Sequence, residues 1–411
     1  MKQYDLEEYK LALRDCLEKT FLRKVKHQDP ISIDLNVIKP LVNYIKNLSG
    51  DPENFLFSKP LYAIWDLTSA CNFRCIHCLY NDKEYSDKND LTTEEAFALA
   101  NELVNDLQIS CINLTGGEIF LRKDALDIIK YFKDNNVAVR LASNAALLNE
   151  EKINKLAEIL DPYTDMIQIS LDGACNETFK KIRLTDTFEK IVSNIEKLVK
   201  AGITVNVAYT VNKINCDEIF AAYKLSDALG VKTFFAGKMV AYNDSHRALV
   251  MSNEDLVVLR SRLLQQDCSN YKTEFRTNFF SVLETLNLPY ASEILKEEAF
   301  VEYFKTFKAP ISKECNFHDR LNIRSDGRVY MCMQADACPN SLLGSYRENS
   351  LLEIWEKRFG NILFEKREMK NGSCSKCLYT GVCNAGCKAI SIQKFNDPNL
   401  PEIECKYFSE L

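Results

Sequence analysis

Long apolar runs are missing from this sequence. No stretch of about 18 consecutive apolar residues occurs, so we expect no transmembrane helix. The first 28 residues, MKQYDLEEYKLALRDCLEKTFLRKVKHQ, are charged throughout and contain no apolar signal-peptide core. The net charge is only −6 over 411 residues, so no basic field would draw the chain to nucleic acid or to an anionic membrane. These absences predict a cytoplasmic protein without a nucleic-acid or membrane partner.

Cysteine, by contrast, is abundant. The chain has 16 cysteines, and most of them gather at 71–78 and at 315–405. Thiols in the cytoplasm are kept reduced, so metal sites explain this number better than disulfides do. The alternative is a secreted protein held together by disulfides. We expect the scattered thiols to pack against neighbouring side chains, and Cys111, which lies in an apolar strand segment, to belong to the core.

The middle of the chain alternates between strand-like and helix-like segments. A parallel sheet with helices outside it accounts for repeated βα units of this kind. Six units are too few for a complete eight-stranded barrel, so we predict the α/β class and an open, partial (β/α)6 barrel. The six expected strands are 61–68, 109–116, 137–144, 166–173, 204–211 and 231–240.

Four regions follow from the changes in pattern along the chain. Residues 1–58 have helical apolar spacing and form an N-terminal helical extension, and residues 59–250 form the partial barrel. Residues 251–310 are predicted to be a mostly helical bridge. Residues 311–411 are rich in cysteine and poor in long apolar periods, so clustered thiols would have to stabilise this last region.

The first cysteine group lies in TSACNFRCIHCLY, directly after the first expected strand. Cys71, Cys75 and Cys78 have the spacing C-x-x-x-C-x-x-C, which is one cysteine short of a closed four-cysteine site. Thiolates at this spacing can wrap one face of a [4Fe–4S] cluster and leave the fourth iron open to a substrate or cofactor. A zinc site completed by His77 or by a distant residue is the alternative.

Glycine and polar residues follow the next strands, at the end of the sheet where chemistry gathers in βα barrels. A Gly-Gly-Glu turn lets the backbone approach a ligand closely and offers a carboxylate to an ammonium group. Each motif alone is ordinary, and their common position after successive strands predicts a shared site. The residues are Gly116, Gly117, Glu118, Asn144, Ser170, Asp172 and Arg183.

These motifs, over about 61–242, resemble those of the radical S-adenosylmethionine (SAM) enzymes. In that family SAM chelates the open iron, and its reductive cleavage gives a 5′-deoxyadenosyl radical that abstracts hydrogen from the substrate. The resemblance implies that Gly116, Gly117 and Glu118 meet the methionine moiety. It also implies that Ser170 and Asp172 meet ribose or methionine, that Arg183 meets the carboxylate, and that His77 lies near adenine.

The second cysteine group resembles the seven-cysteine SPASM pattern found C-terminal to many radical SAM enzymes. That resemblance implies two auxiliary [4Fe–4S] clusters, and therefore three clusters in all. Cys374, Cys377, Cys383 and Cys405 would ligate the distal cluster. The nearer cluster would take Cys315, Cys332 and Cys387, with either Cys338 or an open iron at its fourth position.

The resemblance also bears on function. Three clusters imply an oxygen-sensitive enzyme reduced by a flavodoxin or ferredoxin. Related SPASM proteins mostly modify peptides, which predicts a maturase that crosslinks or oxidises a ribosomally made peptide. The alternatives with the same chemistry are cofactor or small-molecule biosynthesis and sulfatase maturation. The alternative from a different class is a non-catalytic iron–sulfur electron carrier.

Overall fold

The computed structural model describes most of the barrel and parts of the C-terminal region. The described residues are 59–79, 86–241, 244–264, 266, 268, 270–277, 320–338, 340–363 and 387–400. The predicted N-terminal extension lies outside them. Among these described residues, no helix has the length and apolar character needed to cross a membrane.

A single ten-stranded sheet organises this part of the chain, with the order β10-β9-β8-β1-β2-β3-β4-β5-β6-β7. Every neighbouring pair from β8 through β1 to β7 is parallel, whereas β9 is antiparallel to both β8 and β10. The predicted six strands are β1 (Tyr62–Thr68), β2 (Cys111–Gly116), β3 (Ala138–Ser143), β4 (Met166–Ser170), β5 (Val205–Val211) and β6 (Thr233–Lys238). The partial barrel is therefore confirmed.

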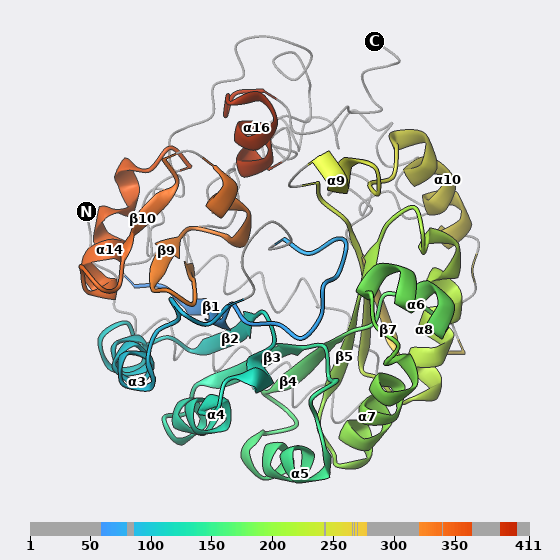
Figure 1. The fold of residues 1–411 in the computed structure, drawn as a ribbon, viewed down its shortest axis with the longest axis horizontal. Coiled ribbons are helices and arrows are strands. Elements are labelled where there is room, and N and C mark those ends of the chain that lie inside the picture. Colours follow the sequence, from blue (N-terminus) through green and yellow to red (C-terminus); the bar gives the residue numbers. More distant parts are fainter. Residues whose placement is uncertain are drawn as a thin grey trace, which may run out of the picture.

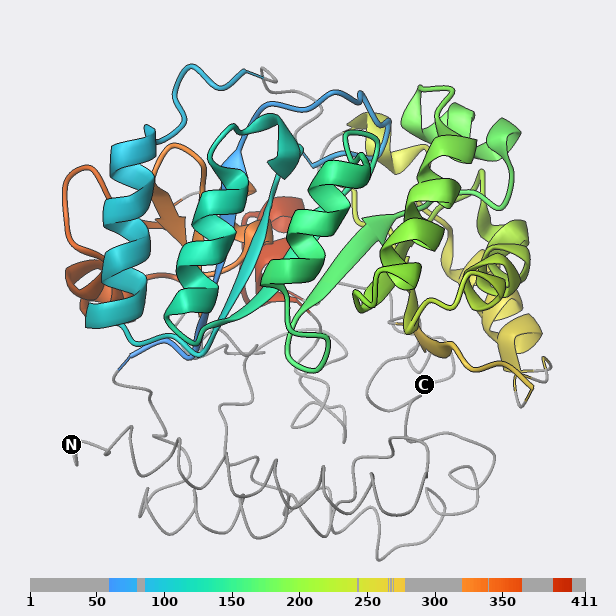
Figure 2. The ribbon, with the colours of Figure 1, turned by 90° about the horizontal axis from the view of Figure 1, so that it is seen from below.

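Helices cover the outer face of the sheet. Figures 1 and 2 show α3, α4, α5 and α7 side by side along it. The helices and short turns of the barrel are α3 (Thr93–Asn101), η2 (Glu102–Asp106), η3 (Ile119–Leu121), α4 (Ala125–Asp134), α5 (Glu150–Ile159), α6 (Asn176–Arg183), α7 (Phe188–Lys200), η4 (Cys216–Glu218), α8 (Ile219–Ala228), α9 (Asp244–Arg247) and α10 (Asn253–Leu264).

Local sequence explains why these helices form where they do. Helix α3 begins at a capping box, in which the Thr92 side chain accepts from the Glu95 N–H and the Glu95 carboxylate accepts from the Thr92 N–H. Helix α7 buries Ile191, Ile195 and Leu198, whose three- and four-residue spacing places them on one face. That face packs against the sheet.

The remaining strands join the same sheet at both edges. Strand β7 (Glu274–Thr277) pairs with β6, within a segment that was expected to be mostly helical. At the other edge, the C-terminal part of the chain adds β8 (Arg320–Ile323), β9 (Arg328–Tyr330) and β10 (Leu342–Ser345). It also contributes η6 (Met333–Ala337), α14 (Leu351–Lys357), η7 (Arg358–Gly360) and α16 (Lys388–Phe395). The barrel and the C-terminal region therefore share one sheet.

Candidate active site

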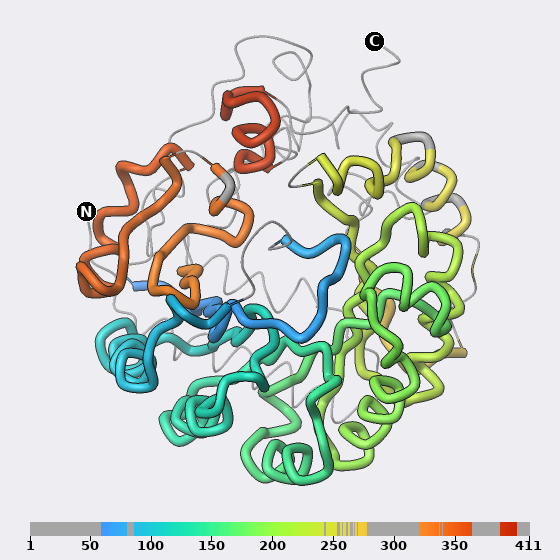
Figure 3. The backbone as a smooth tube through the Cα atoms, viewed as in Figure 1, coloured from blue at the N-terminus to red at the C-terminus, as the bar shows by residue number. Residues whose placement is uncertain are grey.

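The loop that follows β1, residues 69–79, is held tightly at the carboxyl end of the barrel strands, and we call it the cluster loop. Figure 3 traces it as the blue segment after β1, near the centre of the view. The Ala70 carbonyl accepts from the Glu118 N–H at 2.8 Å, and the Ile76 N–H donates to the Ile182 carbonyl on α6 at 3.0 Å. Phe73 is only 4% exposed and belongs to the core. The backbone that carries the cysteines is thus fixed on two sides.

The three thiols of the cluster loop are close enough to influence one another. Burial raises the pKa of Cys71 to about 11, and the neighbouring Cys75, Glu118 and Cys78 also raise it. A thiol with such a pKa becomes a ligand only where a metal ion stabilises its thiolate. Within the described ranges, no three Cys, His, Asp or Glu side chains converge tightly enough to hold one metal ion. The three thiols share one loop and influence one another, and cysteines at this spacing would suit the three ligated irons of a [4Fe–4S] cluster.

The two glycines of the Gly-Gly-Glu turn allow β2 to touch the cluster loop. The Gly117 N–H donates to the Thr68 carbonyl at 2.7 Å. A Cβ at Gly117 would lie 2.0 Å from the Ala70 carbonyl oxygen, and Gly116 has a φ of +127°. Only glycine fits this close approach and this backbone conformation.

Glu118 joins the ends of two strands. It is fully buried, and it accepts from Ser143 Oγ at 2.8 Å, from the Asn144 N–H at 2.7 Å and from the Phe120 N–H at 3.3 Å. The Asn144 side chain in turn donates to Asn72 Oδ1 in the cluster loop at 2.8 Å. Burial raises the pKa of Glu118, and these three hydrogen bonds oppose the rise. In this structure the carboxylate organises the loops, and its contact with the methionine moiety stays a prediction.

A second buried group lies on the α6 side of the cluster loop. Arg183 forms an ion pair with Asp172 and donates from Nη1 to Cys75 Sγ at 3.4 Å. His77 Nε2 is 3.4 Å from Asp172 Oδ2, and the Thr210 N–H donates to Asp172 Oδ1 at 2.6 Å. Burial lowers the pKa of His77 to about 4, so the imidazole is neutral at physiological pH.

The structure brings together every predicted SAM-site motif at this edge of the sheet, with Ser170 at the end of β4. It also adds His246, which the sequence analysis missed. This side chain on α9 is fully buried, and its charge would contribute to lowering the pKa of His77. A single histidine in the short segment DSHR offers no motif that could have predicted this position.

Three of the predicted auxiliary-cluster cysteines lie in the described residues and surround a second, smaller core. Cys338 is 7% exposed and its Sγ lies 3.2 Å from the Ala389 carbonyl oxygen, while Cys387 Sγ lies 3.1 Å from Gln334 Oε1. Burial raises the pKa of Cys338 to about 11, and the nearby Cys387 adds to the rise. Cys332 packs against the same core. The other predicted ligands, Cys315, Cys374, Cys377, Cys383 and Cys405, lie outside the described residues.

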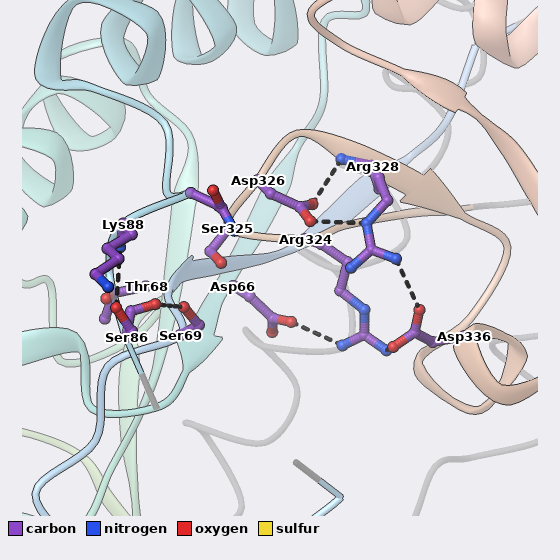
Figure 4. Close-up of a pocket in the computed structure, with 11 residues that line it drawn as sticks. Asp66, Thr68, Ser69, Ser86, Lys88, Arg324, Ser325, Asp326, Arg328 and Asp336 are labelled. Atoms are coloured by element: carbon purple, nitrogen blue, oxygen red, sulfur yellow. Dashed lines mark hydrogen bonds and ion pairs between the residues drawn. The ribbon is translucent and has the colours of Figure 1, made fainter. Parts of the chain in front are cut away.

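An ion network centred on the buried Arg324 connects this region to the barrel. Arg324 is 2.7 Å from Asp66 on β1 and 3.3 Å from Asp336 on η6, and Arg328 is 3.7 Å from Asp336 (Figure 4). Arg324 also donates to the Met333 carbonyl at 3.0 Å. These groups border a cavity of about 210 Å³. The network ties the turn between Cys332 and Cys338 to the strand that leads into the cluster loop.

The barrel and the C-terminal region each match a known protein family. Residues 65–225 match the radical SAM superfamily, and residues 315–378 match the iron-sulfur cluster-binding domain named SPASM. The AdoMet-dependent heme synthase of Methanosarcina barkeri is 28% identical over 356 residues, which is 85% of this chain and 97% of that protein. The mycofactocin maturase MftC of Mycolicibacterium smegmatis is 33% identical over 166 residues, or 40% of this chain and 41% of that protein.

Among solved structures, Streptococcus suis SuiB bound to its precursor peptide SuiA has a similar fold. Its TM-score is 0.68 at 15% identity, covering 92% of this chain and 82% of SuiB. At so low an identity, this similarity shows a shared fold alone. With the cysteine loop, the glycine turn and the partial barrel in place, the chain contains a radical SAM domain over residues 65–225 and carries a C-terminal SPASM domain.

Proposed function

We propose that this protein is a cytoplasmic radical SAM maturase that abstracts hydrogen from a peptide to form a crosslink or an oxidised residue. Cys71, Cys75 and Cys78 would hold the SAM-binding [4Fe–4S] cluster, and the C-terminal cysteines would hold two auxiliary clusters. When bound, the cluster and SAM would supply the hydrogen-abstracting chemistry. A flavodoxin or ferredoxin would supply the electron.

The chain's own residues position this chemistry. Gly116 and Gly117 let β2 touch the cluster loop, and the buried Glu118 fixes the ends of β2 and β3 relative to that loop. Neutral His77 and the Asp172–Arg183 pair close the α6 side of the loop. SAM would bind between these two sides, against Asn144 and Ser170.

The observation that carries the peptide assignment lies on the inner face of the sheet, opposite the helices. Asn113 and Asn322 are both in register with Ile64, so they flank β1 on one face. Asn206 is in register with Gln168, which is in register with Ala142 on the same face.

All three asparagines present a buried amide oxygen that has no hydrogen-bond donor among the described residues: Asn113, Asn206 and Asn322. A buried acceptor without a partner costs about 1–3 kcal/mol, so a substrate that displaces the atoms covering these oxygens and donates to them would gain from binding here. The N–H groups of a peptide backbone are such donors. These acceptors line the face that leads up to the cluster loop, which supports a peptide as the substrate.

The inner face of the sheet also carries groups that would suit a second candidate substrate. Arg140 is in register with Asn113 and is exposed, and a guanidinium binds carboxylates. Cys111, expected in the core, is only partly buried and alternates onto this face with Asn113. Because the heme synthase relative matches nearly along its whole length, a tetrapyrrole with carboxylate side chains is the second candidate.

Anaerobic turnover with two substrates tests the proposal. The reduced, reconstituted full-length protein should form 5′-deoxyadenosine from SAM. With the short peptides encoded beside its gene it should yield a peptide lacking two hydrogen atoms, and with iron coproporphyrin III it should give no product. If the protein converts the porphyrin and leaves the peptides unmodified, the peptide assignment is wrong. If it forms no 5′-deoxyadenosine, the protein is not a radical SAM enzyme.

A matched pair of variants then tests the inner face. Asn113→Ala removes one of the unpaired acceptors and should raise the peptide KM about tenfold, the effect of one hydrogen bond of about 1.4 kcal/mol. Asn105→Ala alters an exposed asparagine on the helical side and should leave the KM unchanged. Equal KM values for the two variants would remove the inner face from substrate binding.

A further inference from the structure

Arg183 is the last residue of α6, and its guanidinium contacts the cluster loop. Its side chain is 10% exposed, and Nη1 donates to Cys75 Sγ at 3.4 Å. Cys75 is itself buried at 7% exposure. A hydrogen bond from a buried cation to the sulfur of a cluster-loop cysteine is more than the packing of a helix end requires.

Asp172 holds this guanidinium in place. The carboxylate is fully buried and pairs with Arg183, and its other oxygen accepts from the Thr210 N–H at 2.6 Å. His77 approaches the carboxylate at 3.4 Å from the cluster loop itself. The backbone adds a further tie, because the Ile76 N–H donates to the carbonyl of Ile182, the residue before Arg183. Arg183 therefore cannot move without disturbing the loop.

We propose that Arg183 is a positioning residue that raises the reduction potential of the cluster held by Cys71, Cys75 and Cys78. This inference rests on the proposed function, because it requires a cluster at those cysteines. Reduction adds negative charge to a cluster, and hydrogen bonds to the ligating sulfurs stabilise the reduced form. The positive charge of the guanidinium acts in the same direction. A cluster that is easier to reduce accepts the electron that SAM cleavage needs.

This role differs from the contact with the SAM carboxylate that the family resemblance implies. Two of the guanidinium nitrogens are engaged with Cys75 and Asp172, whereas Nε is buried and has no acceptor among the described residues. An experiment can distinguish tuning of the cluster from binding of the SAM carboxylate, because the reduction potential of the cluster can be measured without SAM.

An EPR-monitored redox titration of the reconstituted full-length protein, without SAM, tests the proposal. Arg183→Gln removes the charge and should shift the SAM-site cluster to a more negative midpoint potential. Arg183→Lys keeps the charge but loses the planar fork, so its shift should be smaller. Lys181→Gln, an exposed change on the same helix, should leave the potential at the wild-type value, and the auxiliary clusters should not shift in any variant.

The outcomes separate this inference from the proposed function. A wild-type potential in Arg183→Gln, with full iron content and weaker SAM binding, would overturn the inference and assign Arg183 to the SAM carboxylate. If Arg183→Gln binds no iron, Arg183→Lys gives the answer, because a wild-type potential in that variant at full iron content would equally overturn the inference. An unchanged iron content after removal of the three cluster-loop cysteines would instead refute the proposed function.

Discussion

Gly117→Ala should separate the cluster loop from the glycine turn. The added Cβ would lie 2.0 Å from the Ala70 carbonyl oxygen, 2.6 Å from its carbon and 2.9 Å from the Ser69 carbonyl oxygen. All three are backbone atoms, so no side chain can swing away to relieve the contact. Normal contact needs about 3.4 Å, and the start of the cluster loop, which leads into Cys71, must therefore move by more than about 1 Å.

That movement has an energy that can be estimated. The Glu118 N–H to Ala70 carbonyl hydrogen bond at 2.8 Å would break, which costs about 1 kcal/mol, and overpacking adds about 1–3 kcal/mol. A displacement of about 1 Å at a reacting site can lower turnover about 100-fold.

Iron content, the absorbance of the cluster and 5′-deoxyadenosine formation measure the effect. We expect Gly117→Ala to lose the SAM-site cluster or most of the SAM cleavage. Gly360→Ala is the matched control, because a Cβ there meets nothing within 4 Å. Wild-type iron and SAM cleavage within twofold in Gly117→Ala would refute the reasoning.

Three further predictions concern the thiols and His77. Replacing all three cluster-loop cysteines by alanine should abolish 5′-deoxyadenosine formation and remove about four irons, with the C-terminal iron retained; loss of all iron would contradict this result. Cys338→Ala should change the EPR spectrum of one auxiliary cluster and leave the SAM-site signal intact, whereas two unchanged auxiliary signals would show that Cys338 is not a ligand. His77 has a folded pKa of about 4 against 6.5 unfolded, so the unfolded state binds more protons as the pH falls through 6.5. Denaturation of the apo-protein at about pH 5.5 should therefore show about 1.2 kcal/mol less stability than at about pH 7, a loss that His77→Gln should lack.

The sequence predicted the parts of the fold that depend on local patterns. Alternation located β1 to β6, and cysteine spacing located the cluster loop, because each signal is contained in a few neighbouring residues. Strand β7 has only four residues, too few for a periodic signal inside a segment that otherwise favours helix. The joining of β8 to β1 is a tertiary pairing between residues about 260 positions apart, and local spacing carries no information about it.

In the candidate site, too, local sequence patterns predicted some features and could not predict others. Strand ends predicted that Glu118, Asp172 and Arg183 would gather at one edge of the sheet. Their partners were not predictable, because they depend on which loops meet in space: Glu118 faces Ser143 and Asn144, and Arg183 faces Cys75. The unpaired amide oxygen of Asn113 was likewise not predictable. The alternation of residues along a strand predicts which face of the sheet Asn113 occupies, but it does not predict the hydrogen bonds of its side chain.

The two cysteine regions are held at a fixed separation by the sheet and by one buried arginine. Asp66 lies on β1 shortly before the cluster loop, and Asp336 lies between Cys332 and Cys338. Arg324 pairs with both carboxylates, and all three side chains are 5–6% exposed. Removing one partner of such a buried pair costs about 3–5 kcal/mol, so the network resists sliding of η6 relative to β1. In the proposed function, an electron passing between the SAM-site cluster and an auxiliary cluster would cross a distance that β8–β1 pairing and the Arg324 ion pairs hold fixed.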